Sequence, residues 1–233
     1  MKNAAGSQAK WLDVSAERFP GWIASFARRH GDSGTLAVTP AAGSVTFAAP
    51  DGAVAECHPP YAESFVPPAS PPDPAGTAAA VAAHAMAPRT TGVLLVRLGG
   101  YAAGVFTGYP PVLADAKTGS RLVHGRSAAG GWSQHRFARR REKQAGEALR
   151  AAADTAVLVF GRGPRLDAVV LGGDRRAAAE LRGDPRLAPY LALATDRFLT
   201  VPDPRRAVLE STPRLFTAVR IRLTEPAPGE TGG

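Results

Sequence analysis

The sequence predicts an α+β protein, in which a mixed sheet with packed helices is preceded by a small α+β N-terminal unit. Three observations predict this class. The 233 residues are 45% hydrophobic, which is enough to bury a core in one or two domains. A proline-rich stretch, SFVPPASPPDPAGT, interrupts the chain after residue 63. Beyond it, apolar runs separated by glycine and proline turns precede a long helical pattern.

Residues 1–64 are predicted to form the small N-terminal unit. A helix is expected to open at Pro20 and to stop at Gly31, because proline suits the first turn of a helix and glycine its end. Short strands rich in β-branched and apolar residues are expected at 35–38, 44–48 and 54–58.

Residues 65–89 are predicted to be a linker rich in proline and alanine, since five prolines between 67 and 74 exclude a regular element there. An alanine-rich part that ends near residue 87 favours helix. A second domain is expected over 90–225, and the tail 226–233 is predicted to be disordered.

The second domain begins with an antiparallel meander, because Gly99-Gly100 and Pro110-Pro111 separate its first three apolar runs. Its strands are expected at 91–98, 101–107, 112–116, 155–160, 168–171, 198–201 and 217–223. Its helices are expected at 133–153, 175–181 and 204–209.

A glycine-containing segment, 119–132, separates the meander from the first of these helices and is predicted to be a long loop. Between Lys117 and Arg150 the chain carries nine Lys and Arg residues against two Glu, a local charge of +7 out of a total of +8. Nearly all of the net charge therefore lies in the loop and the helix after it, where it favours contact with nucleic-acid phosphates.

Residues with catalytic potential in this stretch are few, because no carboxylate lies between Asp115 and Glu142. Gly130-Gly131 would let the loop backbone approach another molecule closely. Of the polar side chains that follow, a glutamine at 134 can orient a water molecule for attack on an ester, although it cannot act as a strong general base.

These residues resemble a known family. Gly130-Gly131, Ser133 and the run Arg136-Phe137-Ala138-Arg139 resemble the Gly-Gly-Gln loop and following helix of archaeal and eukaryotic class-I release factors. The segment is more similar still to the release-factor-like peptidyl-tRNA hydrolases of the Vms type, in their actinobacterial branch. The resemblance covers 90–223 and implies an RNase-H-like mixed fold for the second domain.

The resemblance also implies a function, which is hydrolysis of the ester between a stalled nascent peptide and its tRNA in the large ribosomal subunit. The implied partners are large-subunit RNA and peptidyl-tRNA, with no cofactor and no metal. The implied catalytic residues are Gln134, Gly130 and Gly131. Those expected to contact RNA are Lys117, Arg121, Arg126, Trp132, Arg136, Arg139, Arg140, Arg141 and Lys143.

One departure from the family pattern concerns Trp132, which stands where release factors have their glutamine. Either the loop is re-registered so that Gln134 reaches the ester, or the site is not catalytic. Trp132 itself can be a core residue under the loop or a stacking platform for a base.

Two other classes of function stay open. One is a non-catalytic module that binds RNA or the ribosome, with Gly130-Gly131 as an ordinary flexible loop and the arginine run as a solvated helix face. The other is a metal-dependent nuclease, although the candidate carboxylates are scattered along the sequence, at Asp115, Asp154, Asp167 and Asp174.

Several further classes are disfavoured. The single cysteine, Cys57, excludes an internal disulfide and is expected to be a small buried hydrophobe, and the five histidines have no zinc-finger spacing. The N-terminus lacks the apolar region of a signal peptide, and no apolar run approaches the roughly 20 residues of a membrane span. We therefore expect a monomeric, cytoplasmic protein that does not contact membranes.

Overall fold

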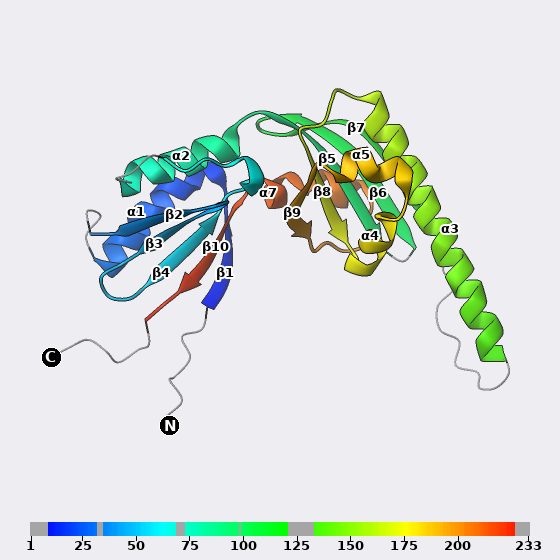
Figure 1. The fold of residues 1–233 in the computed structure, drawn as a ribbon, viewed down its shortest axis with the longest axis horizontal. Helices are drawn as coiled ribbons and strands as arrows, with labels where there is room; N and C mark the ends of the chain where they lie inside the picture. Colours follow the sequence, from blue (N-terminus) through cyan, green and yellow to red (C-terminus); the bar gives the residue numbers. More distant parts are fainter. Residues whose placement is uncertain (1–8, 32–34, 69–72, 98, 121–132, 227–233) are drawn as a thin grey trace. The chain divides into compact units, whose positions relative to one another are not determined.

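The structure is a computed structural model. It describes residues 9–31, 35–68, 73–97, 99–120 and 133–226, including their side chains except at 133–143. The chain divides into two compact units (Figure 1). Unit 1 comprises Met1–Ala87 and Arg214–Gly233, and unit 2 comprises Pro88–Pro213.

Unit 1 is a five-stranded antiparallel sheet in the order β1-β10-β4-β3-β2, with helices on one face (Figure 1). Side chains of β3 and β4 are alternately buried and half-buried, as expected for a sheet with one covered face. Its elements are β1 (Ala9–Val14), η1 (Ala16–Arg18), α1 (Phe19–His30), β2 (Ala37–Ala41), β3 (Ser44–Ala48), β4 (Val54–His58), η2 (Ala62–Ser64), α2 (Pro74–Met86) and β10 (Val219–Thr224).

Local sequence accounts for the two helices of unit 1. Pro20 lies in the first turn of α1, and the helix ends at Gly31, whose φ is +142°. Ile23 and Phe26 are buried, so that this face of α1 packs into the core. The N-terminus of α2 is capped by Asp73, whose carboxylate accepts a 2.6 Å hydrogen bond from the backbone N–H of Gly76.

Unit 2 contains a mixed sheet in the order β7-β6-β5-β8-β9. β5 pairs antiparallel with β6 and β6 antiparallel with β7, whereas β5–β8 and β8–β9 are parallel. This order and these directions confirm the expected RNase-H-like mixed fold. The elements are β5 (Arg89–Arg97), β6 (Gly100–Gly108), β7 (Val112–Ser120), α3 (Ser133–Arg162), β8 (Ala168–Gly173), α4 (Arg175–Leu181), η3 (Pro185–Leu187), α5 (Ala188–Leu191), β9 (Ala194–Leu199) and α6 (Arg206–Glu210); α7 (Pro213–Phe216) leads back to unit 1.

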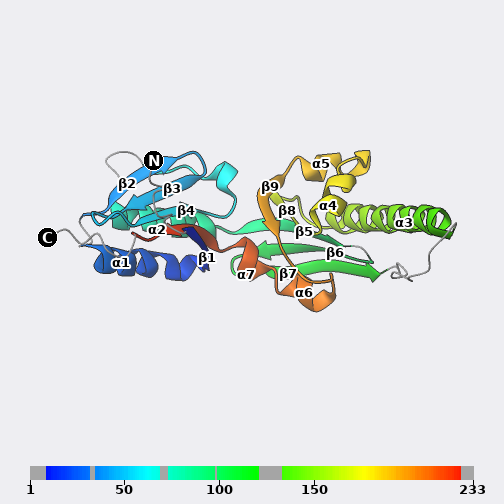
Figure 2. The same ribbon diagram turned by 90° about the horizontal axis from the view of Figure 1, so that it is seen from below.

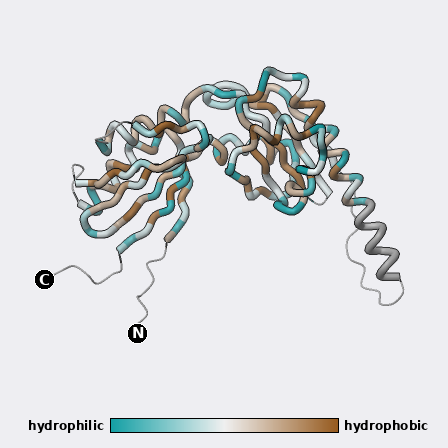
Figure 3. The backbone as a smooth tube through the Cα atoms, viewed as in Figure 1, coloured by the Kyte–Doolittle hydropathy of each residue, from teal (hydrophilic) through white to brown (hydrophobic). Residues whose placement is uncertain are grey.

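The sheet of unit 2 is covered on both faces. Figure 2 shows α3 and α6 on opposite sides of it. Gly104 in β6 lies against Leu209 of α6, whereas its neighbours Ala103 and Val105 belong to the cluster that includes the buried residues of α3. The central strands β5 and β8 are consequently buried along most of their length, and Figure 3 shows the hydrophobic residues concentrated there.

The prediction of a strand at 155–160 is wrong, because these residues form the last part of α3. Ala152, Ala156, Val159 and Phe160 are buried at helical spacing in the core of unit 2. A short apolar run such as TAVLVF fits a buried strand and a buried helix equally well, and the preceding helix decides the outcome here by continuing through it.

The strand predicted at 217–223 exists as β10, but it does not belong to the sheet of the second domain. β10 pairs with β1 on one side and with β4 on the other, as an interior strand of the sheet of unit 1. Backbone pairing between segments about 160 residues or more apart leaves no local mark in the sequence, so the partner of this strand could not be read from its pattern.

Other predicted bounds also change. β1 has no counterpart among the predicted strands, and β9 lies earlier than the expected 198–201. The region 65–89, expected to be a linker, contains α2, which packs against α1 within unit 1. The predicted loop begins later than expected because β7 continues to Ser120. None of the described helices is long and apolar enough to cross a membrane.

Candidate nucleic-acid interface

The candidate site belongs to unit 2, between the end of β7 at Ser120 and the start of α3 at Ser133. Five of the predicted site residues lie in the intervening segment, which is outside the described residues: Arg121, Arg126, Gly130, Gly131 and Trp132. The loop predicted at 119–132 therefore falls mostly outside the described residues, and its first two residues belong to β7. The structure therefore defines the two elements that lead into and out of it.

The first three turns of α3 carry six other predicted site residues. Their backbone is helical, and their side chains lie outside the description: Gln134, Arg136, Arg139, Arg140, Arg141 and Lys143. Spacings of four, three and seven residues put Arg136, Arg140, Lys143 and Arg150 on one side of the helix. Arg150, whose side chain is described, is exposed.

α3 is anchored by its second half. Among its described side chains, Ala152 is the first that is buried. Ser133 precedes it by 19 residues, which at 1.5 Å per residue corresponds to about 28 Å of helix. Figure 1 shows this first half of α3 continuing beyond the sheet of unit 2. The N-terminal end of α3 therefore lies well away from the core in which its second half is buried.

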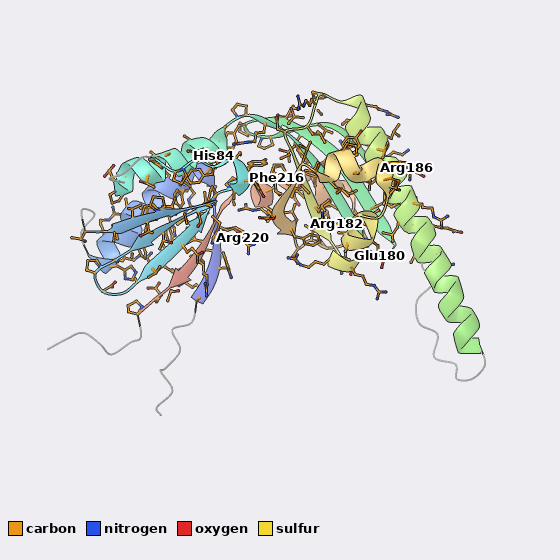
Figure 4. The ribbon with its side chains drawn as sticks, viewed as in Figure 1. His84, Glu180, Arg182, Arg186, Phe216 and Arg220 are labelled. Carbon is orange, nitrogen blue, oxygen red and sulfur yellow. The ribbon has the colours of Figure 1, made fainter. Side chains whose placement is uncertain are left out.

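An ion-pair network also holds α3. The guanidinium of Arg186, which lies beside α3 in Figure 4, donates to Asp154 of α3 at 2.6 Å and to Asp184 at 2.7 Å. The hydrogen bonds from Arg186 lower the pKa of Asp184, and the two carboxylates raise the pKa of Arg186. Both groups thus stay charged around neutral pH, and the network links the turn before η3 to the helix.

Lys117 is the one predicted site residue on β7. It is exposed, and it pairs in register with Ala103 of β6. Sequence reasoning did not select Arg97 and Arg175, which lie at the same end of the sheet as the end of β7. Arg97 donates to the carbonyl of Val201 at 2.8 Å, and Arg175 lies 4.4 Å from the ring centre of Phe198. Only the sheet order brings these cations together, so no local pattern could have identified them.

Three of the four carboxylates considered for a nuclease make structural contacts. Asp167 accepts a 2.7 Å hydrogen bond from the backbone N–H of Thr90, and Asp174 caps α4 through the N–H of Ala177. Asp154 pairs with Arg186. In the described part of the chain, no group of three or more His, Cys, Asp or Glu side chains is arranged to hold a metal ion.

Cys57 is fully buried in β4, as predicted for a small hydrophobic residue, and this burial raises the pKa of its thiol. The thiol is therefore held in its unreactive, protonated form.

The family model of the Actinobacteria/chloroflexi VLRF1 release factor matches residues 89–222, which is more than half of the chain and includes most of unit 2. Comparison with curated protein sequences gives no match.

Solved structures with low sequence identity also align with the chain. The archaeal translation termination factor aRF1 aligns at 16% identity and a TM-score of 0.40, over 71% of this chain and 48% of that protein. The Vms1 mitochondrial localization core aligns at 10% identity and a TM-score of 0.37, over 76% of this chain and 75% of that one. The chain thus spans about half the length of the archaeal factor.

The family match begins with β5, continues through the segment 121–132 and α3, and ends within β10. It therefore includes the Gly130-Gly131 run and the helix after it, from which the resemblance to release factors was inferred, and it confirms that resemblance. The chain belongs to the Actinobacteria/chloroflexi VLRF1 release factor family.

Proposed function

We propose that this protein hydrolyses the ester that joins a nascent peptide to tRNA on stalled large ribosomal subunits, and so rescues the ribosome. The observation that carries this proposal is the position of Gln134. It lies in the first turn of a helix whose first buried side chain, Ala152, comes about 27 Å further along, and it stands three residues after Gly131. Such an arrangement suits the delivery of a small polar group into a confined RNA site.

The proposed chemistry needs one ordered water molecule. The side-chain amide of Gln134 positions this water, whose oxygen attacks the ester carbonyl carbon. Backbone N–H groups of the Gly130-Gly131 segment stabilise the negative charge that develops on the carbonyl oxygen. The bond to the ribose oxygen of the tRNA then breaks, and the proton released by the water passes to that oxygen, with the neighbouring ribose hydroxyl as relay.

The distribution of charge supports RNA as the partner of unit 2. Unit 2 carries 20 Lys and Arg against 11 Asp and Glu, whereas unit 1 carries 8 against 9. The excess positive charge of the molecule therefore belongs entirely to unit 2. We assign phosphate contacts to Arg126, Arg136, Arg139 and Arg140, with further RNA contacts from Lys117, Arg121, Arg141 and Lys143 and base stacking from Trp132.

The test is release of labelled peptide from peptidyl-tRNA bound to isolated large subunits, compared with cleavage of plain RNA, each with and without a chelator. Ester hydrolysis that survives chelation, with plain RNA intact, supports the proposal. Ribosome binding without release would identify the non-catalytic module, for which Trp132 in place of the usual glutamine is the specific argument. RNA cleavage abolished by the chelator would instead identify a nuclease.

A further inference from the structure

Tyr101 lies at the end of the unit 2 sheet where β7 leads into the candidate site. It is the second residue of β6, and it pairs directly with Gly119, the second-last residue of β7. A Cβ atom added to Gly119 would overlap the ring and hydroxyl of Tyr101. The tyrosine ring therefore lies across the backbone of Gly119, in the space that any other side chain at 119 would occupy.

Space, rather than backbone conformation, favours glycine at 119. Gly119 is not among the glycines with positive φ, and it keeps the ladder pairing of an ordinary strand. Cross-strand pairs in which an aromatic ring covers a glycine are known to pin the register of β-sheets. Here such a pair acts two residues before the segment 121–132 begins.

The same ring also packs toward the helix that follows this segment. Tyr101 alternates along β6 with Ala103 and Val105, so these three residues share the face of the sheet that α3 covers. Ala103 and Val105 belong to one buried cluster with Ala152 and Ala156 of α3, and Tyr101 packs against that cluster. One side chain thus supports both the strand that enters the candidate loop and the core that anchors the helix leaving it.

We propose that Tyr101 is a positioning residue for peptide release: by covering Gly119 and packing against the cluster that holds α3, it fixes the end of β7 relative to the helix that carries Gln134. This inference rests on the proposed function, because its main consequence is catalytic. A displacement of about 1 Å in a group that positions a reactant can reduce a rate about 100-fold. Tyr101 itself is not proposed to touch the substrate.

The first test compares peptide release by four variants. We expect Tyr101→Ala and Gly119→Ala to lower kcat by about 10- to 100-fold with KM within about threefold, and Tyr101→Phe, which keeps the ring, to match the wild type. Tyr190→Ala is the matched control, because Tyr190 packs against the same cluster and contacts Phe160 with ring centres 5.4 Å apart, near the other end of α3. It should lower the melting temperature without lowering kcat.

A second variant at position 101 keeps the test decisive when the alanine variant is unfolded. If Tyr101→Ala does not fold, Tyr101→Leu keeps apolar volume against the cluster but leaves Gly119 uncovered, and the same loss of kcat is expected. The double variant Tyr101→Ala with Gly119→Ala should be no slower than the slower single variant, because both changes break one contact. Equal kcat for the Tyr101 and Tyr190 alanine variants would overturn the proposal.

A distance measurement separates this inference from the proposed function. Spin labels at Ser120→Cys and Ser133→Cys report on the two ends of the segment, and Cys57→Ala removes the one native thiol, which is buried. Tyr101→Ala should broaden or shift the distance distribution, and Tyr190→Ala should not. Unchanged distances in both would overturn the positioning role. Changed distances in Tyr101→Ala, together with a wild-type protein that releases no peptide, would overturn only the proposed function.

Discussion

Gln134 is the second residue of α3, so its backbone position is set by a helix rather than by a free loop. A helical scaffold can hold a water-positioning amide with less motion than a loop can. Trp132 precedes that helix, outside the described residues. Which of two side chains reaches the ester, the amide of Gln134 or the indole of Trp132, therefore decides which residue is catalytic.

Replacing Gln134 by Ala should preserve binding to the large subunit and reduce peptide release by about 10²- to 10³-fold, the usual effect of removing one positioned polar group from a hydrolytic site. Single-turnover release, together with a pelleting assay for binding, measures both quantities. Activity within about threefold of the wild type, equivalent to less than 1 kcal/mol in the barrier, would contradict the assignment. A larger loss in the parallel variant Trp132→Ala would move the reacting tip to 132.

Asp51 is a residue of unit 1 whose ionisation is coupled to folding. Its carboxylate accepts a 3.0 Å hydrogen bond from the backbone N–H of Ala53 and lies 2.8 Å from Nδ1 of His30. These two contacts, the backbone hydrogen bond first, lower the pKa of Asp51. The folded state thus binds the proton less tightly than the unfolded chain does.

A lowered pKa gives stability that is fully present above the ordinary aspartate pKa of about 3.9 and is lost as the pH falls toward the folded-state value. Asp51→Asn should therefore lower stability at pH 6 and narrow the difference in stability between pH 6 and pH 3. Urea denaturation of wild type and variant at the two pH values measures this. If the free energy of unfolding differs between pH 6 and pH 3 by the same amount in the variant as in the wild type, Asp51 does not contribute to acid sensitivity.

The element that matters most for the proposed function is α3, which combines a buried half with a basic half. The buried half, from Ala152 onward, is part of the core of unit 2 and is tied by Asp154 to Arg186. The basic half carries Arg139, Arg140 and Arg141, and its backbone is helical. Because the two halves are one continuous helix, the packing of the buried half also fixes the position of the basic half.

Neutralising Arg139, Arg140 and Arg141 together to Gln should weaken ribosome binding and lower the salt slope of binding by up to about three units, since each lost phosphate contact removes roughly one. Glutamine is a good helix former, so the melting temperature should hold. The matched control neutralises Arg18, Arg28 and Arg29, which are exposed in unit 1. If the two triple variants have the same salt slope, the cluster in α3 is a solvated surface.

At the scale of the whole molecule, the chain builds unit 1 from both of its ends. β10 lies between β1 and β4, so that an interior strand of the unit 1 sheet follows unit 2 in the sequence. Ile221 and Leu223 of β10 are fully buried there. Unit 1 can therefore be completed only after unit 2 has been synthesised, and its stability depends on the last strand.

Ile221→Ala should lower the stability of unit 1 by about 2 to 5 kcal/mol, the typical cost of a large-to-small change in a core. Amide exchange measured by mass spectrometry should show faster exchange in β1, β3, β4 and β10, with the buried half of α3 unchanged. Arg222→Ala, at an exposed position of the same strand, is the control. Equal loss of protection in the two units would mean that they unfold as one.

Features that depend on neighbouring residues could be predicted from the sequence alone. The helices at Pro20 and at Arg175, the strands at 44–48 and 54–58, and the meander after residue 89 follow from local turns, caps and periodicity. The resemblance to release factors also rested on one contiguous run, and the family match confirmed it. The roles of Gln134 and of the arginines stay predictions.

Features that depend on pairing between segments far apart in the sequence follow only from the tertiary structure. The run at 155–160 became helix because it continues one that packs on the sheet, and β10 joined unit 1 because its partners lie in β1 and β4. Tyr101 meets Gly119 only through the register of β6 and β7. The free energy of such contacts comes from surfaces that are buried between segments far apart in the chain, and a local pattern records that a surface is apolar without recording which other surface will cover it.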